Sequence, residues 1–145
     1  MSLLLTFKAI SVTFSLLAIS TGLQALLTPF AFSKSFGIPI QTLTNPLNPS
    51  SSKEKSSTTD VAAAALAYVS LMGIRQFTTG LTLLVFASQG KWTEMATILS
   101  ILGFVVAGTD GIVLWKAGMR REGMFHSLPG ALIAILSCAV VLAER

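Results

Sequence analysis

An arginine lies near the middle of a long apolar stretch of this sequence. Residues 62–86 read AAAALAYVSLMGIRQFTTGLTLLVF, with Arg75 close to the midpoint. About 20 mostly apolar residues are enough for a helix to cross the hydrocarbon core of a bilayer. A charge at that depth costs on the order of 2.5–3.5 kcal/mol on insertion scales, so it marks a candidate site that needs a partner. The stretch therefore predicts a membrane helix with a polar centre.

The composition extends this prediction to the whole chain. Hydrophobic residues make up 52% of the sequence and charged residues only 11%, whereas about 25% of a soluble domain is charged. A chain of 145 residues has room for about four spans. We expect one all-α integral membrane domain over residues 1–145, a four-transmembrane-helix bundle in up-down-up-down order. The helices are predicted at about 7–28, 61–87, 92–115 and 124–142, with a flexible polar loop at about 41–59.

The basic residues favour membrane orientation over nucleic-acid binding. The net charge is +4, but the basic residues lie at the ends of apolar segments. There they set topology or meet anionic headgroups. We predict a multi-pass protein of the endoplasmic reticulum or another internal membrane, with the loop 30–59 in the cytosol. The loop side carries Lys34, Lys53, Lys55, Lys116, Arg120 and Arg121, against Lys8, Lys91 and Arg145 on the side of the termini.

Polar residues on the other spans lie at depths from which they can approach Arg75. At a rise of 1.5 Å per residue, Asp110 is roughly 7–9 Å below the loop-side surface. His126 is within about one turn of that surface, and the long side chain of Arg75 can extend toward it. We predict Arg75, Asp110 and His126 as catalytic residues. The predicted substrate-binding residues are Gln24 on the first helix and, on the same face of the second as Arg75, Tyr68, Met72 and Thr79.

Several short motifs resemble one family. They are Phe36-Gly37-Ile38-Pro39, Gly73-Ile74-Arg75 followed by Gly80, Thr109-Asp110-Gly111, and His126. Together they resemble the small four-helix membrane proteins catalogued as domain of unknown function 4267. In that family an acid usually follows the arginine, whereas this chain has Gln76. The resemblance implies a source among filamentous fungi or actinobacteria and, in fungi, a role in secondary-metabolite pathways, but no reaction. Fungal anthrone oxygenases are similar in size and layout, which is an analogy of fold.

Three classes of function stay open, of which a small transporter is the least favoured. The first is a membrane-embedded enzyme acting on a lipophilic small molecule by isomerisation, cyclisation or dehydration, or by a cofactor-free oxidation. Arg75 would polarise an oxygen, while Asp110 and His126 would move or orient a proton. The second is a non-catalytic scaffold, lipid-binding protein or accessory subunit, in which Arg75 and Asp110 form a structural ion pair. A transporter would need oligomers, and the repeated halves typical of one are not visible.

Neither a metal nor an organic cofactor is expected. One histidine and one membrane aspartate make a poor ligand set, and the single cysteine, Cys138, supports no disulfide or redox pair. No Gly-rich phosphate loop, GxSxG or HExxH motif is present. The expected partners are the lipid bilayer and a lipophilic substrate, with no nucleic acid and with oligomerisation left open.

Overall fold

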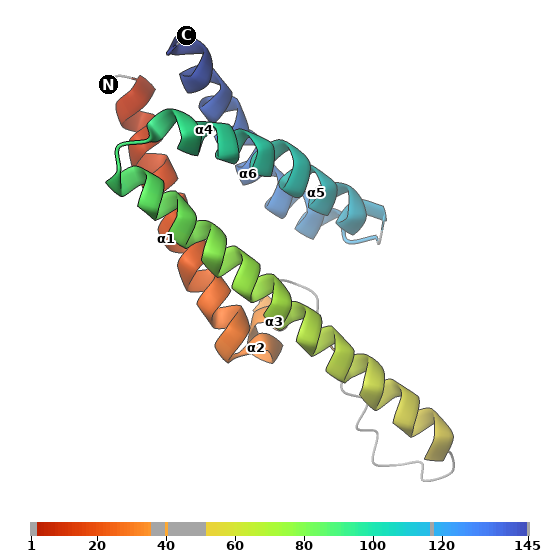
Figure 1. The fold of residues 1–145 in the computed structure, drawn as a ribbon. Helices are drawn as coiled ribbons and strands as arrows, with labels where there is room; N and C mark the ends of the chain where they lie inside the picture. The colour runs from red at the N-terminus through yellow and green to blue at the C-terminus, as the bar shows by residue number, and fades with distance from the viewer. Residues whose placement is uncertain (1–2, 36–39, 41–51, 117, 145) are drawn as a thin grey trace. The chain divides into compact units, whose positions relative to one another are not determined.

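The described part of the chain is almost entirely helical, apart from short connections such as residues 89–91. A computed structural model describes residues 3–35, 40, 52–116 and 118–144, without the side chains of residues 52–60, 122 and 126. No strand occurs among these residues, so the all-α prediction is confirmed. The elements, drawn in Figure 1, are α1 (Leu3–Leu27), α2 (Pro29–Ser35), α3 (Ser52–Ser88), α4 (Trp92–Ile101), the π-helical segment η1 (Leu102–Val106), α5 (Ala107–Lys116) and α6 (Arg120–Ala143).

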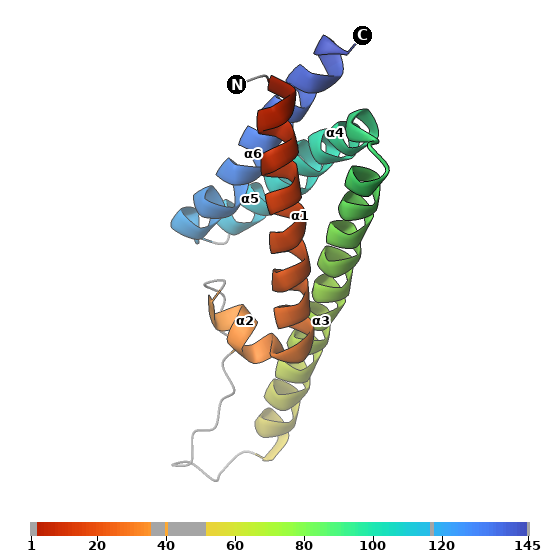
Figure 2. The same cartoon turned by 90° about the vertical axis from the view of Figure 1, so that its left-hand side faces the viewer.

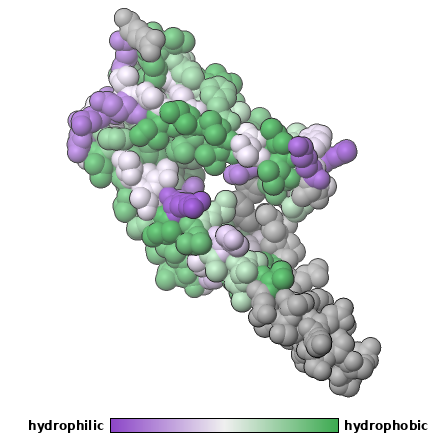
Figure 3. Space-filling view, turned by 45° about the vertical axis from the view of Figure 1, so that its right-hand side comes forward, coloured by the Kyte–Doolittle hydropathy of each residue, from purple (hydrophilic) through white to green (hydrophobic). Residues whose placement is uncertain are grey.

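Four helices in the described residues are long and apolar enough to cross a membrane. Many of their large hydrophobic side chains are exposed, and Figure 3 shows hydrophobic residues over much of the visible helical surface. Such extensive apolar exposure is typical of lipid-facing surface. The chain is therefore a multi-pass membrane protein with the four predicted spans. They are Leu3–Leu27, Val61–Ser88, Trp92–Lys116, made by α4, η1 and α5 in succession, and Gly123–Ala143.

Pro29 ends α1 and begins α2. Proline lacks the amide that would continue α1, but its fixed backbone angle suits the first position of a new helix. The amide of Thr28 still donates to the carbonyl of Gln24 at 2.8 Å, and Phe32 donates to Thr28 at 2.9 Å. Figure 2 shows α2 turning away from the axis of α1 at this point. The region after the first span thus contains a short helix.

Helix α3 begins earlier than predicted. Its first residue is Ser52, whereas the hydropathy placed the start at about residue 61. Residues 52–59, expected to belong to a flexible loop, are helical, and we correct the loop to end before Ser52. Lysine and glutamate are good helix formers, and no glycine or proline interrupts the sequence from 52 to 60. The helix therefore continues beyond the apolar span; residues 41–51 lie outside the described residues.

The described residues fall into two compact units. The first unit comprises Met1–Leu17 and Thr79–Arg145, and the second comprises Ala18–Thr78. The prediction of one domain stays a prediction. In the first unit, residues from α1, α3, α4 and α6 form one hydrophobic core: Phe7, Leu83, Met95, Ala96, Leu99, Ile133 and Val140.

Buried hydroxyl groups inside this first unit are satisfied within their own helices. Ser11, Ser15 and Ser137 each donate to the backbone carbonyl four residues earlier, at 2.6–2.7 Å. In a membrane span no water is available to serve as the acceptor, so this back-bonding removes the cost of burying the hydroxyl. These serines are accordingly part of the packing and leave the candidate chemistry to other residues.

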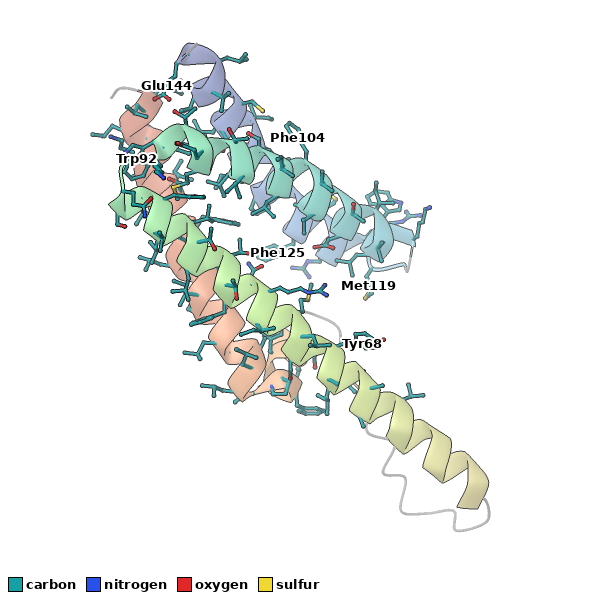
Figure 4. All side chains as sticks on the ribbon, viewed as in Figure 1. Tyr68, Trp92, Phe104, Met119, Phe125 and Glu144 are labelled. Carbon is teal, nitrogen blue, oxygen red and sulfur yellow. The ribbon has the colours of Figure 1, made fainter. Side chains whose placement is uncertain are left out.

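One end of the first unit gathers the start of α1, the start of α4 and the end of α6. The Nζ atom of Lys8 lies 4.8 Å from the centroid of the Trp92 ring. The hydroxyl of Thr93 donates to the carboxylate of Glu144, and Figure 4 shows Trp92 and Glu144 at this end. Both termini of the helical bundle therefore lie on the same side as the 89–91 turn, as predicted.

Candidate functional site

Helices α5 and α6 approach each other closely because small residues line their contact. An added Cβ at Gly111 would lie 2.7 Å from the Cβ of Ser127, and one at Gly103 would lie 2.6 Å from the Cβ of Ala134. Neither position has room for a larger side chain. Stripes of small residues let membrane helices pack backbone to backbone. The small residues of the third span therefore allow a close helix contact.

The backbone of both helices is irregular where they meet. The π-helical segment Leu102–Val106 interrupts the third span, and Pro129 lies inside α6. The carbonyl of Gly130, next to Pro129, lies against Gly103 inside the π-helical segment, so the two irregularities face each other. Proline removes one helical hydrogen bond, and π-helical turns occur frequently at functional sites. Sequence reasoning missed the π-helical segment, since LGFVV is uniformly apolar, but Pro129 was a visible signal.

The helical register places Asp110 and residue 126 at the same height along the axis of the α5–α6 pair. Gly111 contacts Ser127 directly, and the two helices run in opposite directions. Asp110 precedes Gly111, and His126 precedes Ser127. At about 100° per residue, both positions fall on one flank of the α5–α6 contact. Asp110 is half-buried there, whereas the side chain of His126 lies outside the described residues.

The opposite flank of the same pair holds an open groove of about 310 Å³. It runs beside Trp115, whose ring centroid lies 5.3 Å from the Cζ of Arg120. Ile112 and Met124 line it. Each stands two residues from Asp110 or His126, which puts it on the other side of its helix. The remaining lining residues are Gly108, Gly111, Lys116, Gly123 and Ser127. The sequence prediction did not include this groove.

The second unit contains a different pair, formed by α1 and α3. An added Cβ at Gly22 would lie 2.5 Å from the backbone nitrogen of Phe77 and 2.8 Å from the carbonyl oxygen of Gly73. By the helical period, the predicted face of α3 lies on the side opposite to Gly73. Tyr68 is 72% exposed there and extends outward from α3 in Figure 4, and Met72 is 52% exposed.

The predicted site residues are thus distributed over both units. Arg75 is exposed on the same face of α3 as Tyr68 and Met72, and Gln24 is exposed on α1, on the side away from Gly22. Thr79 belongs to the first unit, as do Asp110 and His126. Their convergence on one cavity stays a prediction. Among the described residues, no three histidine, cysteine, aspartate or glutamate side chains are grouped to hold a metal ion.

Comparison with known proteins gives one relationship. No curated protein and no solved structure was matched. The family model described as "Domain of unknown function (DUF4267)" matches residues 15–140. The match begins inside α1 and ends inside α6, so it includes α5, Asp110 and His126. The chain therefore belongs to the DUF4267 family.

Proposed function

We propose that this protein is a membrane-embedded enzyme that acts on a lipophilic small molecule by proton transfer. The observation that carries the proposal is the placement of Asp110 and residue 126 at one level, on one flank of the α5–α6 pair. Histidine and carboxylate side chains are the groups that most often move protons in enzymes. Ionisable groups within membrane spans are costly and mark functional sites by default. The pair is therefore the best candidate for the chemistry.

The chemistry needs only the substrate and this pair. His126 removes a proton from a carbon next to a carbonyl group, and the electron pair of the broken C–H bond moves onto the carbonyl oxygen as an enolate. Asp110 orients the imidazole and balances its positive charge. Return of the proton at another carbon completes an isomerisation. Loss of a hydroxyl group, leaving as water with that proton, completes a dehydration. The predicted role of Arg75, to stabilise the enolate oxygen, rests on the sequence alone.

The substrate enters from the bilayer under this proposal. A lipophilic molecule dissolved in the hydrocarbon reaches a flank of two membrane helices without crossing water. Family membership, with the resemblance to fungal proteins, favours a secondary-metabolite pathway in the endoplasmic reticulum or another internal membrane. In that orientation the loop 30–59 faces the cytosol, as the distribution of basic residues predicts.

Complementation of a deletion strain tests the proposal. The lipophilic extract of cells lacking the protein is compared with that of wild-type cells by mass spectrometry. We expect a precursor to accumulate that has the mass of the missing product, or that mass plus one water. Asp110→Asn and His126→Gln should fail to restore the product at a normal membrane level of the protein. The matched control is Glu94→Gln, an exposed acid in the first turn of α4.

The second candidate is a non-catalytic lipid-binding or accessory protein. The open groove on the other flank of α5–α6 favours it, because the groove offers an apolar surface without predicted catalytic residues. Full restoration of the product by both Asp110→Asn and His126→Gln would contradict the enzyme and favour this alternative. Arg75→Gln, measured in the same strain, tests the predicted role of the arginine separately.

A further inference from the structure

We infer that the groove between α5 and α6 binds an anionic phospholipid of the surrounding bilayer. The groove lies in the first unit, with a volume of about 310 Å³, and its walls are mostly glycines and apolar side chains, together with Lys116 and Ser127. Gly108 leaves it open, because an added Cβ there meets nothing within 4 Å, whereas Gly123 packs against the backbone of Gly111. An apolar channel at the surface of a membrane span is filled by an acyl chain.

Charge at one end of the groove selects the headgroup. Lys116 lines the groove, and the guanidinium of Arg120 stacks on Trp115, which also lines it. Two cations therefore stand at the end where α5 leaves the bilayer. Basic groups between membrane helices bind anionic headgroups, and tryptophan is enriched at that depth. The turn 116–122 carries three basic residues and one acidic residue, so its net charge attracts a phosphodiester anion.

The groove is separate from the proposed catalytic flank. Ile112 and Met124 line it, whereas Asp110 and His126 lie on the opposite side of the same helices. The bound lipid is accordingly a resident ligand and not the substrate. The inference does not depend on the enzyme proposal, and the two are tested by different variants.

Gly108 provides a variant that fills the groove without disturbing the helix contact. An added Cβ there meets nothing within 4 Å, although Gly108 lines the groove. Gly108→Leu therefore places a side chain where the acyl chain would lie. An added Cβ at Gly111, by contrast, would lie 2.7 Å from Ser127 and would change the packing as well.

Fluorescence of Trp115 measures the occupant directly. The full chain with Trp92→Phe, which leaves Trp115 as the only tryptophan, is reconstituted in vesicles of phosphatidylcholine containing a small fraction of brominated phosphatidylglycerol or brominated phosphatidylcholine. We expect phosphatidylglycerol to quench more strongly. Its apparent affinity should fall about fivefold for each charge removed in Lys116→Gln and Arg120→Gln. It should also fall in Gly108→Leu, but not in Lys91→Gln or Asp110→Asn.

Two outcomes would overturn the inference. Equal quenching by both brominated lipids would mean that Trp115 meets only ordinary bilayer lipid. Loss of the preference on adding inorganic phosphate would mean that the cations bind free phosphate and not a lipid headgroup. Native mass spectrometry of the wild-type chain extracted from membranes gives a measurement that does not need Trp92→Phe. It should find phosphatidylglycerol or another anionic phospholipid retained by the wild type and lost from Lys116→Gln with Arg120→Gln.

Discussion

The α1–α3 pair of the second unit and the α5–α6 pair of the first use glycine in the same way but leave different surfaces. At Gly22 an added Cβ would lie 2.5 Å from a backbone nitrogen of α3, so that contact is closed. In α5–α6 the contact at Gly111 is equally tight, yet Gly108, three residues earlier, faces open space. The α5–α6 pair therefore combines a closed centre with an open flank.

The two pairs also differ in the regularity of their backbones. Within the second unit, α1 and α3 are regular α-helices, so their small residues stay in register along the contact. In the first unit, Leu102–Val106 is π-helical and Pro129 interrupts α6. A π-helical turn holds more residues than an α-helical turn, which rotates the residues that follow. The α5–α6 pair therefore combines an irregular backbone with an open position at Gly108.

The largest expected effect is on enzymatic activity, which we expect to depend on the α5–α6 pair. Asp110→Asn should lower formation of the product by about 100-fold or more, because the amide cannot accept or balance a proton. The rate is measured per amount of protein in isolated membranes, with the precursor found in the deletion strain. Thr109→Val is the matched control, since the hydroxyl of Thr109 donates only to the carbonyl of Val105 in its own helix, at 2.6 Å. Equal losses in both variants would contradict a specific role for Asp110.

The next largest effect is on the free energy of unfolding, and it concerns the closed contact of the α1–α3 pair. Gly22→Ala should destabilise the protein by about 1–3 kcal/mol, since the new methyl group meets backbone atoms of α3 that cannot move aside. The free energy of unfolding is measured by titration with sodium dodecyl sulfate in mixed micelles. Leu23→Ala, at the neighbouring exposed position, is the control and should cost much less. An unchanged free energy of unfolding in Gly22→Ala would mean that α1 and α3 are farther apart at Gly22 than in the structure.

The sequence predicted the spans well because hydropathy and length are local properties. The predicted third span, 92–115, ends one residue before Lys116. The prediction from sequence missed the start of α3 at Ser52, because hydropathy does not detect a helix that continues beyond the apolar span. It also missed η1, because the choice between α-helical and π-helical turns depends on what Gly103 packs against.

The candidate site was predictable only in part, because part of it depends on how the helices pack. Asp110 and His126 were identifiable as ionisable residues within or next to apolar segments, and their common level follows from an antiparallel pair. The groove was not identifiable. It depends on which glycines lie in the helix contact, as Gly103 does, and which face open space, as Gly108 does. The sequence indicated Lys116 and Arg120 only as topology signals, although they lie at the groove.

A smaller effect tests the π-helical segment itself. Since a π-helical turn holds extra residues, deletion of Phe104 should let the segment become α-helical while α5 keeps its contact with α6. Phe104 is exposed and its side chain projects away from the helix in Figure 4. We expect a loss of about 1 kcal/mol. Deletion of Thr97, from the regular helix α4, should instead rotate the rest of the span and abolish folding. Equal damage from the two deletions would contradict the assignment of the segment as a removable irregularity.

The smallest effect has the opposite sign and bears on the open flank. Gly108→Ala should stabilise the protein by about 0.5–1 kcal/mol, because alanine loses less backbone entropy on forming a helix and the methyl group enters open space. The same substitution at Gly103 should destabilise, since its Cβ would lie 2.6 Å from that of Ala134. Both are measured by the unfolding titration used for Gly22. If Gly108→Ala also destabilises, Gly108 lies in a closed contact, and the α5–α6 pair has no open flank at this position.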